Sequence, residues 1–294
     1  MANLEPVAIV GSLGFIGRRL QQQLEAKGYP VVGVDRGGLD DEASLAQIAK
    51  TSTIYWAAST INPAVAAADP SRVEADLGVF RNFLDMLDAA NSAARVVLFS
   101  SGGTIYGKAT PPFKEDSFAV PIAEYGKAKL LLEKELRSRQ RSGVSIRISN
   151  VYGPGQYPAP GQGVIGHWLF AAAAEKPVQV IGSLEVIRDY VYIDDLVNAL
   201  VSIIEKPELP QIINVGSGVP STLEDVLAAV KNAVGSGLEI EASPSRAFDL
   251  DRVWLDCTRA EQALGWRAET SLDDGVRHTW EWVSGLAAHG GLSR

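Results

Sequence analysis

The chain has 294 residues, of which 46% are hydrophobic and 21% are charged. This length fits two modest domains or one elaborated α/β domain, and the composition excludes a disordered or collagen-like chain. Because 35 acidic residues outnumber 27 basic ones, the net charge is −8, which argues against a nucleic-acid-binding protein. No apolar run approaches the roughly 18 residues of a membrane span, and the N-terminus does not have the pattern of a secretory signal. We therefore expect a cytoplasmic protein with no membrane partner.

Short apolar segments alternate with amphipathic ones along the first half of the chain. Strands are predicted at 6–10, 31–34, 53–58, 95–101 and 144–148, and helices at 15–27, 71–90 and 124–142. Strands that are apolar throughout are typical of a parallel sheet covered on both faces. The alternation predicts a doubly wound α/β fold.

A stretch rich in glycine and proline, at 153–163, follows the last of these strands. It indicates a boundary between a first domain, 1–150, and a smaller second lobe, 151–294, and we expect the two to exchange segments. In the second lobe, helices are predicted at 165–174, 194–205, 222–234 and 272–286, and strands at 178–181 and 212–215. Ser271 is the expected N-cap of the last helix.

Three glycines, Gly11, Gly14 and Gly17, lie between the first strand and the first helix. Glycines there permit a tight turn and let backbone N–H groups approach a pyrophosphate, although three glycines in such a turn can also serve packing alone. Asp35 ends the second strand, where a carboxylate can accept both hydroxyls of an adenosine ribose. This carboxylate favours NAD over NADP, whereas the neighbouring Arg36 could pair with a 2′-phosphate.

Tyr125 and Lys129 lie four residues apart in a predicted helix and so share one face. An ammonium group beside a phenol favours the phenolate, and such a pair can act as a general acid and base on an alcohol or ketone. A Tyr–Lys pair on a helix is usually an exposed pair with no catalytic role. This pair, however, follows a strand that ends in a hydroxyl-rich turn at 100–107.

Six motifs in chain order give the sequence its similarity to a known family. They are the glycine loop, the serine-rich strand end, Tyr125-x-x-x-Lys129, Arg147-x-x-Asn150-x-Tyr152-Gly153-Pro154-x-Gln156, Arg188-Asp189-Tyr190-x-Tyr192-x-x-Asp195 and Leu264-Gly265-Trp266. Over nearly its whole length the chain resembles the extended short-chain dehydrogenase/reductases, in their nucleotide-sugar epimerase/dehydratase branch. The resemblance implies a Rossmann-type NAD-binding domain at 1–150 and a smaller C-terminal α/β lobe at 151–294 that binds a nucleotide diphosphate sugar, here taken as UDP-linked.

The resemblance also implies roles for the residues that match its motifs. Tyr125 would be the acid and base, and Lys129 would hold the nicotinamide ribose. The cofactor would be bound by Gly11, Gly14, Phe15, Ile16, Gly17, Asp35, Arg36, Ala57, Ala58, Ser100, Tyr125 and Lys129. The substrate would be bound by Asn150, Arg188, Arg246, Asp249 and Val253, the last of them beside C2 of the sugar. No metal is expected.

The hydroxyl-rich turn departs from the family pattern. Its third position, which usually carries the hydroxyl that bonds the reacting oxygen, is Gly102. Thr104 would point to the same side of an extended segment and is favoured as the substitute, with Ser101 as the other candidate. Gly103 and Thr104 stand where 4,6-dehydratases of this branch carry Asp-Glu, and where decarboxylases carry Glu in the second position. The lack of a carboxylate favours simple removal and return of a hydride.

Two further expectations concern the sheet edge and the assembly. The segment between Asp35 and Thr53 is so short that the sheet's third strand is expected to be curtailed or missing, with Asp40 or Asp41 replacing the usual adenine-side aspartate. In this family the helices predicted here at 71–90 and 124–142 often form a homodimer interface. The leucines that serve either that interface or the core are Leu84, Leu87, Leu130, Leu131 and Leu136.

We therefore predict an NAD-dependent epimerase that inverts C4 of a UDP-hexose through a 4-keto intermediate. A nucleotide-sugar 4-ketoreductase that consumes NAD(P)H would share nearly all of these residues and is the main alternative. A non-catalytic NAD-binding sensor or scaffold is a more distant one, because the Tyr–Lys pair is intact.

Overall fold

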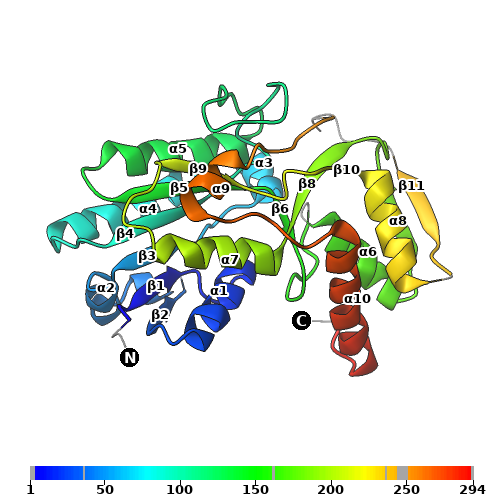
Figure 1. The fold of residues 1–294 in the computed structure, drawn as a ribbon, viewed down its shortest axis with the longest axis horizontal. Helices are drawn as coiled ribbons and strands as arrows, with labels where there is room; N and C mark the ends of the chain where they lie inside the picture. Colours follow the sequence, from blue (N-terminus) through cyan, green and yellow to red (C-terminus); the bar gives the residue numbers. More distant parts are fainter. Residues whose placement is uncertain (1–3, 36, 161–162, 236, 244–250, 293–294) are drawn as a thin grey trace.

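A six-stranded sheet forms the centre of the fold, in the order β2-β1-β3-β4-β5-β9. Its strands are β1 (Val7–Val10), β2 (Val31–Val34), β3 (Thr53–Trp56), β4 (Arg95–Ser101), β5 (Gly143–Ile148) and β9 (Ile212–Val215). The computed structural model describes residues 4–35, 37–160, 163–235, 237–243 and 251–292 (Figure 1). Because every neighbouring pair is parallel, the carboxyl ends of all six strands meet at one edge. The predicted doubly wound parallel sheet is confirmed.

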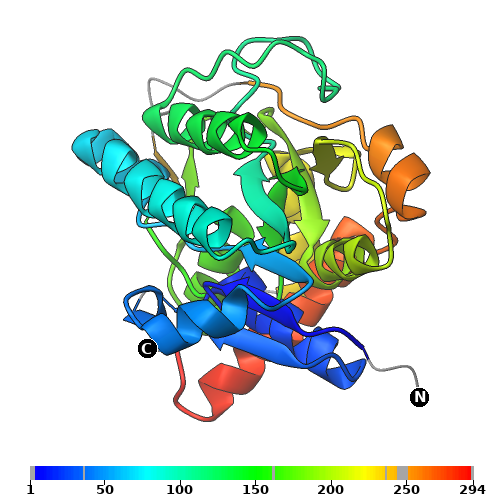
Figure 2. The ribbon, with the colours of Figure 1, turned by 90° about the vertical axis from the view of Figure 1, so that its left-hand side faces the viewer.

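Helices cover both faces of this sheet because successive strand residues point to opposite sides. On one face, Val7 and Ile9 of β1 belong to the cluster that includes α1 (Phe15–Ala26) and α7 (Ile193–Ile204). On the other face, Ala8 and Val10 belong to the cluster that includes α4 (Ser71–Ala89) and α5 (Glu124–Ser138). Figure 2 shows α4 and α5 side by side.

The second half of the chain is divided between two places. One part builds a smaller layer beside the central sheet (Figure 1). That layer contains the sheet of β10 (Pro220–Thr222), β8 (Ile187–Tyr192) and β6 (Asn150–Tyr152), the pair β11 (Ile240–Ser243) and β7 (Val178–Ile181), and the helices α6 (Val164–Ala173), α8 (Leu223–Val234) and α10 (Leu272–Ala288). The other part, α7 and β9, returns to the central sheet, so the two halves interleave along the chain.

Short elements were not anticipated from the sequence. They are the 3₁₀ turn η1 (Gly37–Leu39) and the helices α2 (Glu42–Ile48), α3 (Pro63–Ala68) and α9 (Thr258–Leu264), with β6, β8, β10 and β11. Beyond β2 the described chain forms η1 and α2 where a further strand was expected to be curtailed or missing. Asp41 caps α2, and hydrogen bonds that its carboxylate accepts from the Ser44 hydroxyl and from the Ser44 N–H lower the pKa of that carboxyl.

The ends of two helices and the burial of several leucines can be compared with the predictions. The α5 helix ends at Ser138, four residues before the predicted end, and Ser271 caps α10 as predicted. Leu84, Leu87 and Leu136 are core residues, whereas Leu131 is 37% exposed. None of the helices in the described part of the chain combines the length and the apolarity that a bilayer span requires.

Candidate active site

The glycine loop lies at the carboxyl edge of the sheet, between β1 and α1. Gly11 has a φ of +93°, and a Cβ there would lie 2.8 Å from the Ala58 backbone nitrogen. A Cβ at Gly17 would lie 2.2 Å from the Gly11 carbonyl oxygen, so neither position has room for a side chain. Gly14 is the N-cap of α1, where no side chain caps the helix and no acidic residue lies in the first turn. The loop therefore presents the N-terminus of a 12-residue helix in a form that suits an anion such as a pyrophosphate.

The other residues predicted to hold a cofactor surround this loop. Phe15 and Ile16 are half-buried in the first turn of α1, and Ala57 and Ala58 are half-buried directly after β3. Asp35 follows β2 and is exposed, and its Oδ1 atom accepts hydrogen bonds from the N–H groups of Gly37 and Gly38 in η1, at 3.1 and 3.4 Å. Arg36 lies outside the described residues.

Tyr125 and Lys129 lie in the first turns of α5. The Lys129 Nζ atom is 5.6 Å from the centre of the Tyr125 ring and donates a hydrogen bond to the Phe99 carbonyl oxygen at 3.3 Å. Lys129 is 5% exposed, so its ammonium group is held from the β4 side rather than by solvent. A Cβ at Gly126 would lie 2.4 Å from the Thr104 carbonyl oxygen. Glycine at this position therefore lets the Tyr–Lys helix pack directly on the hydroxyl-rich turn.

Two hydroxyl groups of that turn are joined, because Thr104 Oγ1 donates a hydrogen bond to Ser101 Oγ at 2.8 Å. A Cβ at Gly102 would lie 2.6 Å from Leu255 Cδ1, so the side-chain direction at this position is filled by a leucine. The Ser100 hydroxyl is buried and donates to Glu133 Oε1 at 2.6 Å. Its hydroxyl is therefore directed at Glu133 in the core.

A buried ion pair that sequence reasoning overlooked lies behind the turn. Glu133 of α5 is fully buried and accepts hydrogen bonds from Arg147 Nε at 2.9 Å and from Nη2 at 2.8 Å. Burial opposes the charge on Arg147, but its hydrogen bonds and attraction to Glu133 outweigh this and raise its pKa. The available sequence signal was a carboxylate on the same helix face as Lys129, between the buried leucines Leu132 and Leu136.

Three residues predicted to bind substrate lie on neighbouring backbone segments. Asn150 Nδ2 donates to the Asp189 carbonyl oxygen at 3.0 Å, which places it beside the β8 strand that carries Arg188. The Val253 N–H donates to the Ile187 carbonyl oxygen at 3.0 Å on the same strand. The Val253 side chain is 2% exposed and belongs to an apolar cluster with Tyr106, Phe113 and Leu255. Arg246 and Asp249 lie outside the described residues.

The carboxylate of Asp189 holds this region together. It accepts hydrogen bonds from the Ser217 N–H and hydroxyl at 2.8 Å, and from the N–H groups of Gly218 and Leu255 at 3.2 Å. Burial raises its pKa against the opposing effect of these hydrogen bonds. A Cβ at Gly216 would lie 2.5 Å from Asp189 Oδ2, which explains the glycine beside it.

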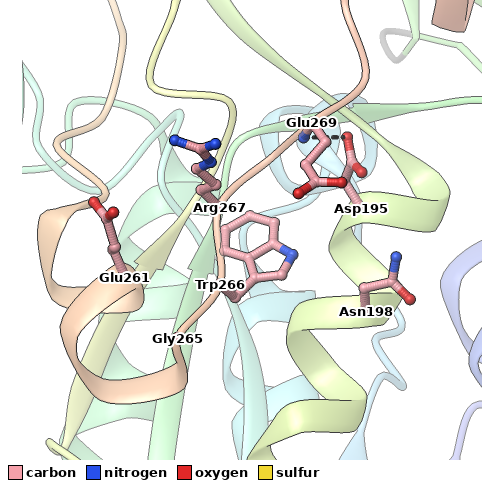
Figure 3. A pocket seen from close by; sticks show the side chains of 7 residues that line it. All are labelled: Asp195, Asn198, Glu261, Gly265, Trp266, Arg267 and Glu269. Carbon is pink, nitrogen blue, oxygen red and sulfur yellow. Dashed lines mark hydrogen bonds between the residues drawn. The ribbon is translucent and has the colours of Figure 1, made fainter.

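A separate hollow of about 310 Å³ lies between α7 and the segment after α9 (Figure 3). It is lined by Asp195, Asn198, Glu261, Gly265, Trp266, Arg267 and Glu269. The Asp195 carboxylate accepts the N–H groups of Glu269 and Thr270, at 3.3 and 2.9 Å, so it fastens the chain segment that forms the wall. None of the predicted site residues lines this hollow. Within the described ranges, no three His, Cys, Asp or Glu side chains are grouped to hold a metal ion.

The fold and this edge of the sheet define the class of protein. The model of the NAD dependent epimerase/dehydratase family matches residues 7–216, and the chain belongs to this family. This membership confirms the predicted family and an NAD-dependent enzyme.

Individual relatives agree with that class. The UDP-glucose 4-epimerase of Mycolicibacterium smegmatis is 31% identical over 307 residues, which cover 93% of this chain and 97% of the relative. The dTDP-4-dehydro-6-deoxyglucose reductase of Escherichia coli is 30% identical over 306 residues, covering 92% and 95%. The structure of the UDP-glucose 4-epimerase from Thermus thermophilus in complex with NAD superposes with a TM-score of 0.86 at 27% identity, covering 95% of this chain and 99% of that one.

Proposed function

We propose that this protein is an NAD-dependent 4-epimerase of a nucleotide diphosphate hexose that is UDP-linked. The observation that carries the proposal is the packing of the Tyr125–Lys129 helix on the Ser101–Thr104 hydroxyl pair, at the same sheet edge as the glycine loop. The similarity to UDP-glucose 4-epimerases over nearly the full chain supports the choice of substrate.

The residues at the carboxyl edge fit NAD. Gly11, Gly14 and Gly17 would hold the pyrophosphate, since a Cβ at the first or last of them would collide with backbone and the helix N-terminus carries no side-chain cap. Asp35 would accept the adenosine ribose hydroxyls. When bound, NAD supplies the hydride-transfer chemistry.

The chain's own residues would move and hold the proton. Tyr125 would accept the proton of the sugar 4-hydroxyl and return it at the end of the cycle. Lys129, fixed to the Phe99 carbonyl, would place a positive charge beside the phenol and bind the nicotinamide ribose. The Thr104 hydroxyl, which is hydrogen-bonded to Ser101, would form a hydrogen bond with the reacting oxygen.

The substrate would lie against β6 and β8. Arg188 would bind a phosphate, because its planar fork matches phosphate oxygens, and Asn150 would contact the diphosphate. Their adjacency across β6 and β8 supports this assignment. The other residues proposed to bind the substrate are Arg246, Asp249 and Val253.

Replacement of Tyr125 by phenylalanine tests the assignment. The variant keeps the ring and its packing but has no proton to exchange, so interconversion of UDP-glucose and its 4-epimer should fall by roughly 100-fold or more. The affinity for NAD should be retained, which serves as the internal control. Full turnover by Tyr125→Phe would contradict the proposal.

A nucleotide-sugar 4-ketoreductase is the second candidate. It is favoured by the 30% identity to the dTDP-4-dehydro-6-deoxyglucose reductase of Escherichia coli. The two activities differ in cofactor balance, because an epimerase ends with NAD unchanged whereas a reductase consumes reduced cofactor in proportion to product. Stoichiometric loss of NADH or NADPH absorbance with a 4-keto sugar would favour the reductase. Turnover of neither sugar class, with NAD still bound, would favour the non-catalytic sensor or scaffold.

We further propose that the protein is a cytoplasmic homodimer that uses α4 and α5. Val79 is 42% exposed and Leu131 is 37% exposed on these two adjacent helices, so each offers apolar surface to a second copy. Sedimentation velocity should show a dimer that Leu131→Asp weakens. A wild-type monomer at micromolar concentration would contradict the proposed assembly, and cell fractionation tests the location.

A further inference from the structure

The overlooked carboxylate of Glu133 suggests how the acid–base helix is held in place. We propose that Glu133 is a positioning residue that fixes α5, and with it Tyr125 and Lys129, relative to the hydroxyl-rich turn after β4. This inference rests on the proposed function, because it assigns Glu133 a role in the reaction of that same site.

The spacing places the three side chains on one face of α5. Tyr125, Lys129 and Glu133 follow one another at intervals of four residues. Lys129 donates to the carbonyl oxygen of Phe99, and Glu133 accepts from the hydroxyl of Ser100 at 2.6 Å. Successive turns of the helix are thus tied to successive residues of β4, which runs directly on into the turn.

The apolar contacts of α5 fix its register less sharply than its hydrogen bonds do. Leu132 and Leu136 pack the helix on the sheet, but apolar contact is non-directional and fixes a position along the axis only weakly. Hydrogen bonds have narrow distance and angle preferences, so the two contacts with β4 restrict that position more sharply. A misplacement of about 1 Å can cost roughly 100-fold in rate, which makes the register relevant to catalysis.

Arg147 orients the Glu133 carboxylate. Its Nε and Nη2 atoms meet the two oxygens of Glu133 as a fork, which fixes the carboxylate plane and leaves Oε1 directed at Ser100. Arg147 is held in turn by the Glu115 carbonyl oxygen at 3.3 Å and lies 4.9 Å from the centre of the Tyr106 ring. A buried ion pair contributes little to stability relative to apolar packing. Its defined geometry is the property that a positioning role uses.

The test removes only the link to β4. Ser100→Ala deletes the hydroxyl that meets Glu133 and leaves the Glu133–Arg147 pair intact. We expect kcat for UDP-sugar epimerisation to fall by about tenfold or more, with KM and the NAD dissociation constant within about twofold of wild type, since roughly 1 Å of misplacement affects the reacting geometry rather than binding. Ser100→Thr, which keeps a hydroxyl, should restore most of the rate.

Ser145→Ala is the matched control. Ser145 lies on the neighbouring strand β5, is fully buried, and its hydroxyl has no hydrogen-bond partner among the described residues. Loss of this hydroxyl should leave kcat within about twofold of wild type, because a buried hydroxyl without a partner holds nothing in place. An equal fall of kcat in both alanine variants would mean that Ser100→Ala acts by general disruption, and would overturn the inference.

Two further outcomes would also overturn it, namely an unchanged kcat in Ser100→Ala, or a fall that is matched by weaker NAD binding. Hydrogen exchange separates this inference from the proposed function. The amides of α5 should exchange faster in Ser100→Ala than in Ser145→Ala whichever sugar is the substrate. If the wild-type protein does not turn over UDP-sugars, the proposed function fails, while equal exchange in the two variants means that the inference itself fails.

Discussion

Gly102 offers the sharpest test of how the hydroxyl-rich turn is built. The family pattern has serine or threonine at this position, so Gly102→Ser looks like a restoration. In this chain the added Cβ would lie 2.6 Å from Leu255 Cδ1 and 3.2 Å from the Arg147 carbonyl oxygen. Non-bonded carbon atoms prefer about 3.5–4.0 Å, so the overlap with the leucine is roughly 1 Å.

The surroundings leave little room for relief. Leu255 is 1% exposed and belongs to an apolar cluster with Tyr106, Phe113 and Val253. Its backbone N–H donates a hydrogen bond to the Asp189 carboxylate at 3.2 Å, which limits movement of this segment. Overpacking of this kind costs about 1–3 kcal/mol. At about 2 cal/mol/K of unfolding entropy per residue, the midpoint of thermal unfolding should fall by about 2–5 °C.

Calorimetry and epimerase assays of Gly102→Ser measure both consequences. We expect lower stability and no gain in kcat, because the new hydroxyl would face Leu255 rather than the sugar. Gly103→Ser is the control, since a Cβ there meets nothing within 4 Å. In a double-mutant cycle, Leu255→Ala should cost less in the serine background than alone. A Gly102→Ser variant with unchanged stability and higher kcat would refute the reasoning, and with it the choice of Thr104 as the reacting hydroxyl.

Two other predictions concern the glycine loop and the hydrogen bonds that the buried Asp189 carboxylate accepts. Gly11→Ala should weaken NAD binding about tenfold or more, because alanine at a φ of +93° is strained by about 1–3 kcal/mol and its Cβ would collide with backbone atoms. Calorimetric titration measures the NAD affinity. Gly78→Ala is the control, since a Cβ at Gly78 meets nothing within 4 Å. Asp189→Asn should lower the free energy of unfolding by about 1–3 kcal/mol, because an amide nitrogen cannot accept the N–H groups of the carboxylate's present partners. Urea unfolding measures this free energy, with Asp116→Asn at an exposed position as the control. Equal unfolding midpoints for the two variants would argue against a stabilising role of the Asp189 hydrogen bonds.

Local chemistry made the central part of the fold predictable. The apolar strands, the amphipathic helices and the Ser271 cap depend on residues within a few positions of one another, and the structure contains them close to the predicted bounds. The glycine loop and the Tyr125–Lys129 pair were predictable for the same reason, since the turn and the helical spacing bring their members together. Helix α2 has too few residues to show a clear period, and the β8 sequence is interrupted by the charged residues Arg188 and Asp189.

The sequence by itself determined the strand–helix alternation, the glycine loop and the acid–base pair, because each depends on neighbours in the chain. Only the tertiary structure decided that β9 joins the central sheet and α7 covers one of its faces, that Leu255 fills the space beside Gly102, and that Glu133 joins Ser100 to Arg147. Those contacts join residues far apart in sequence, and packing rather than local propensity selects them. The chain's periodicity indicates that a residue is buried, but not which distant residue it is buried against.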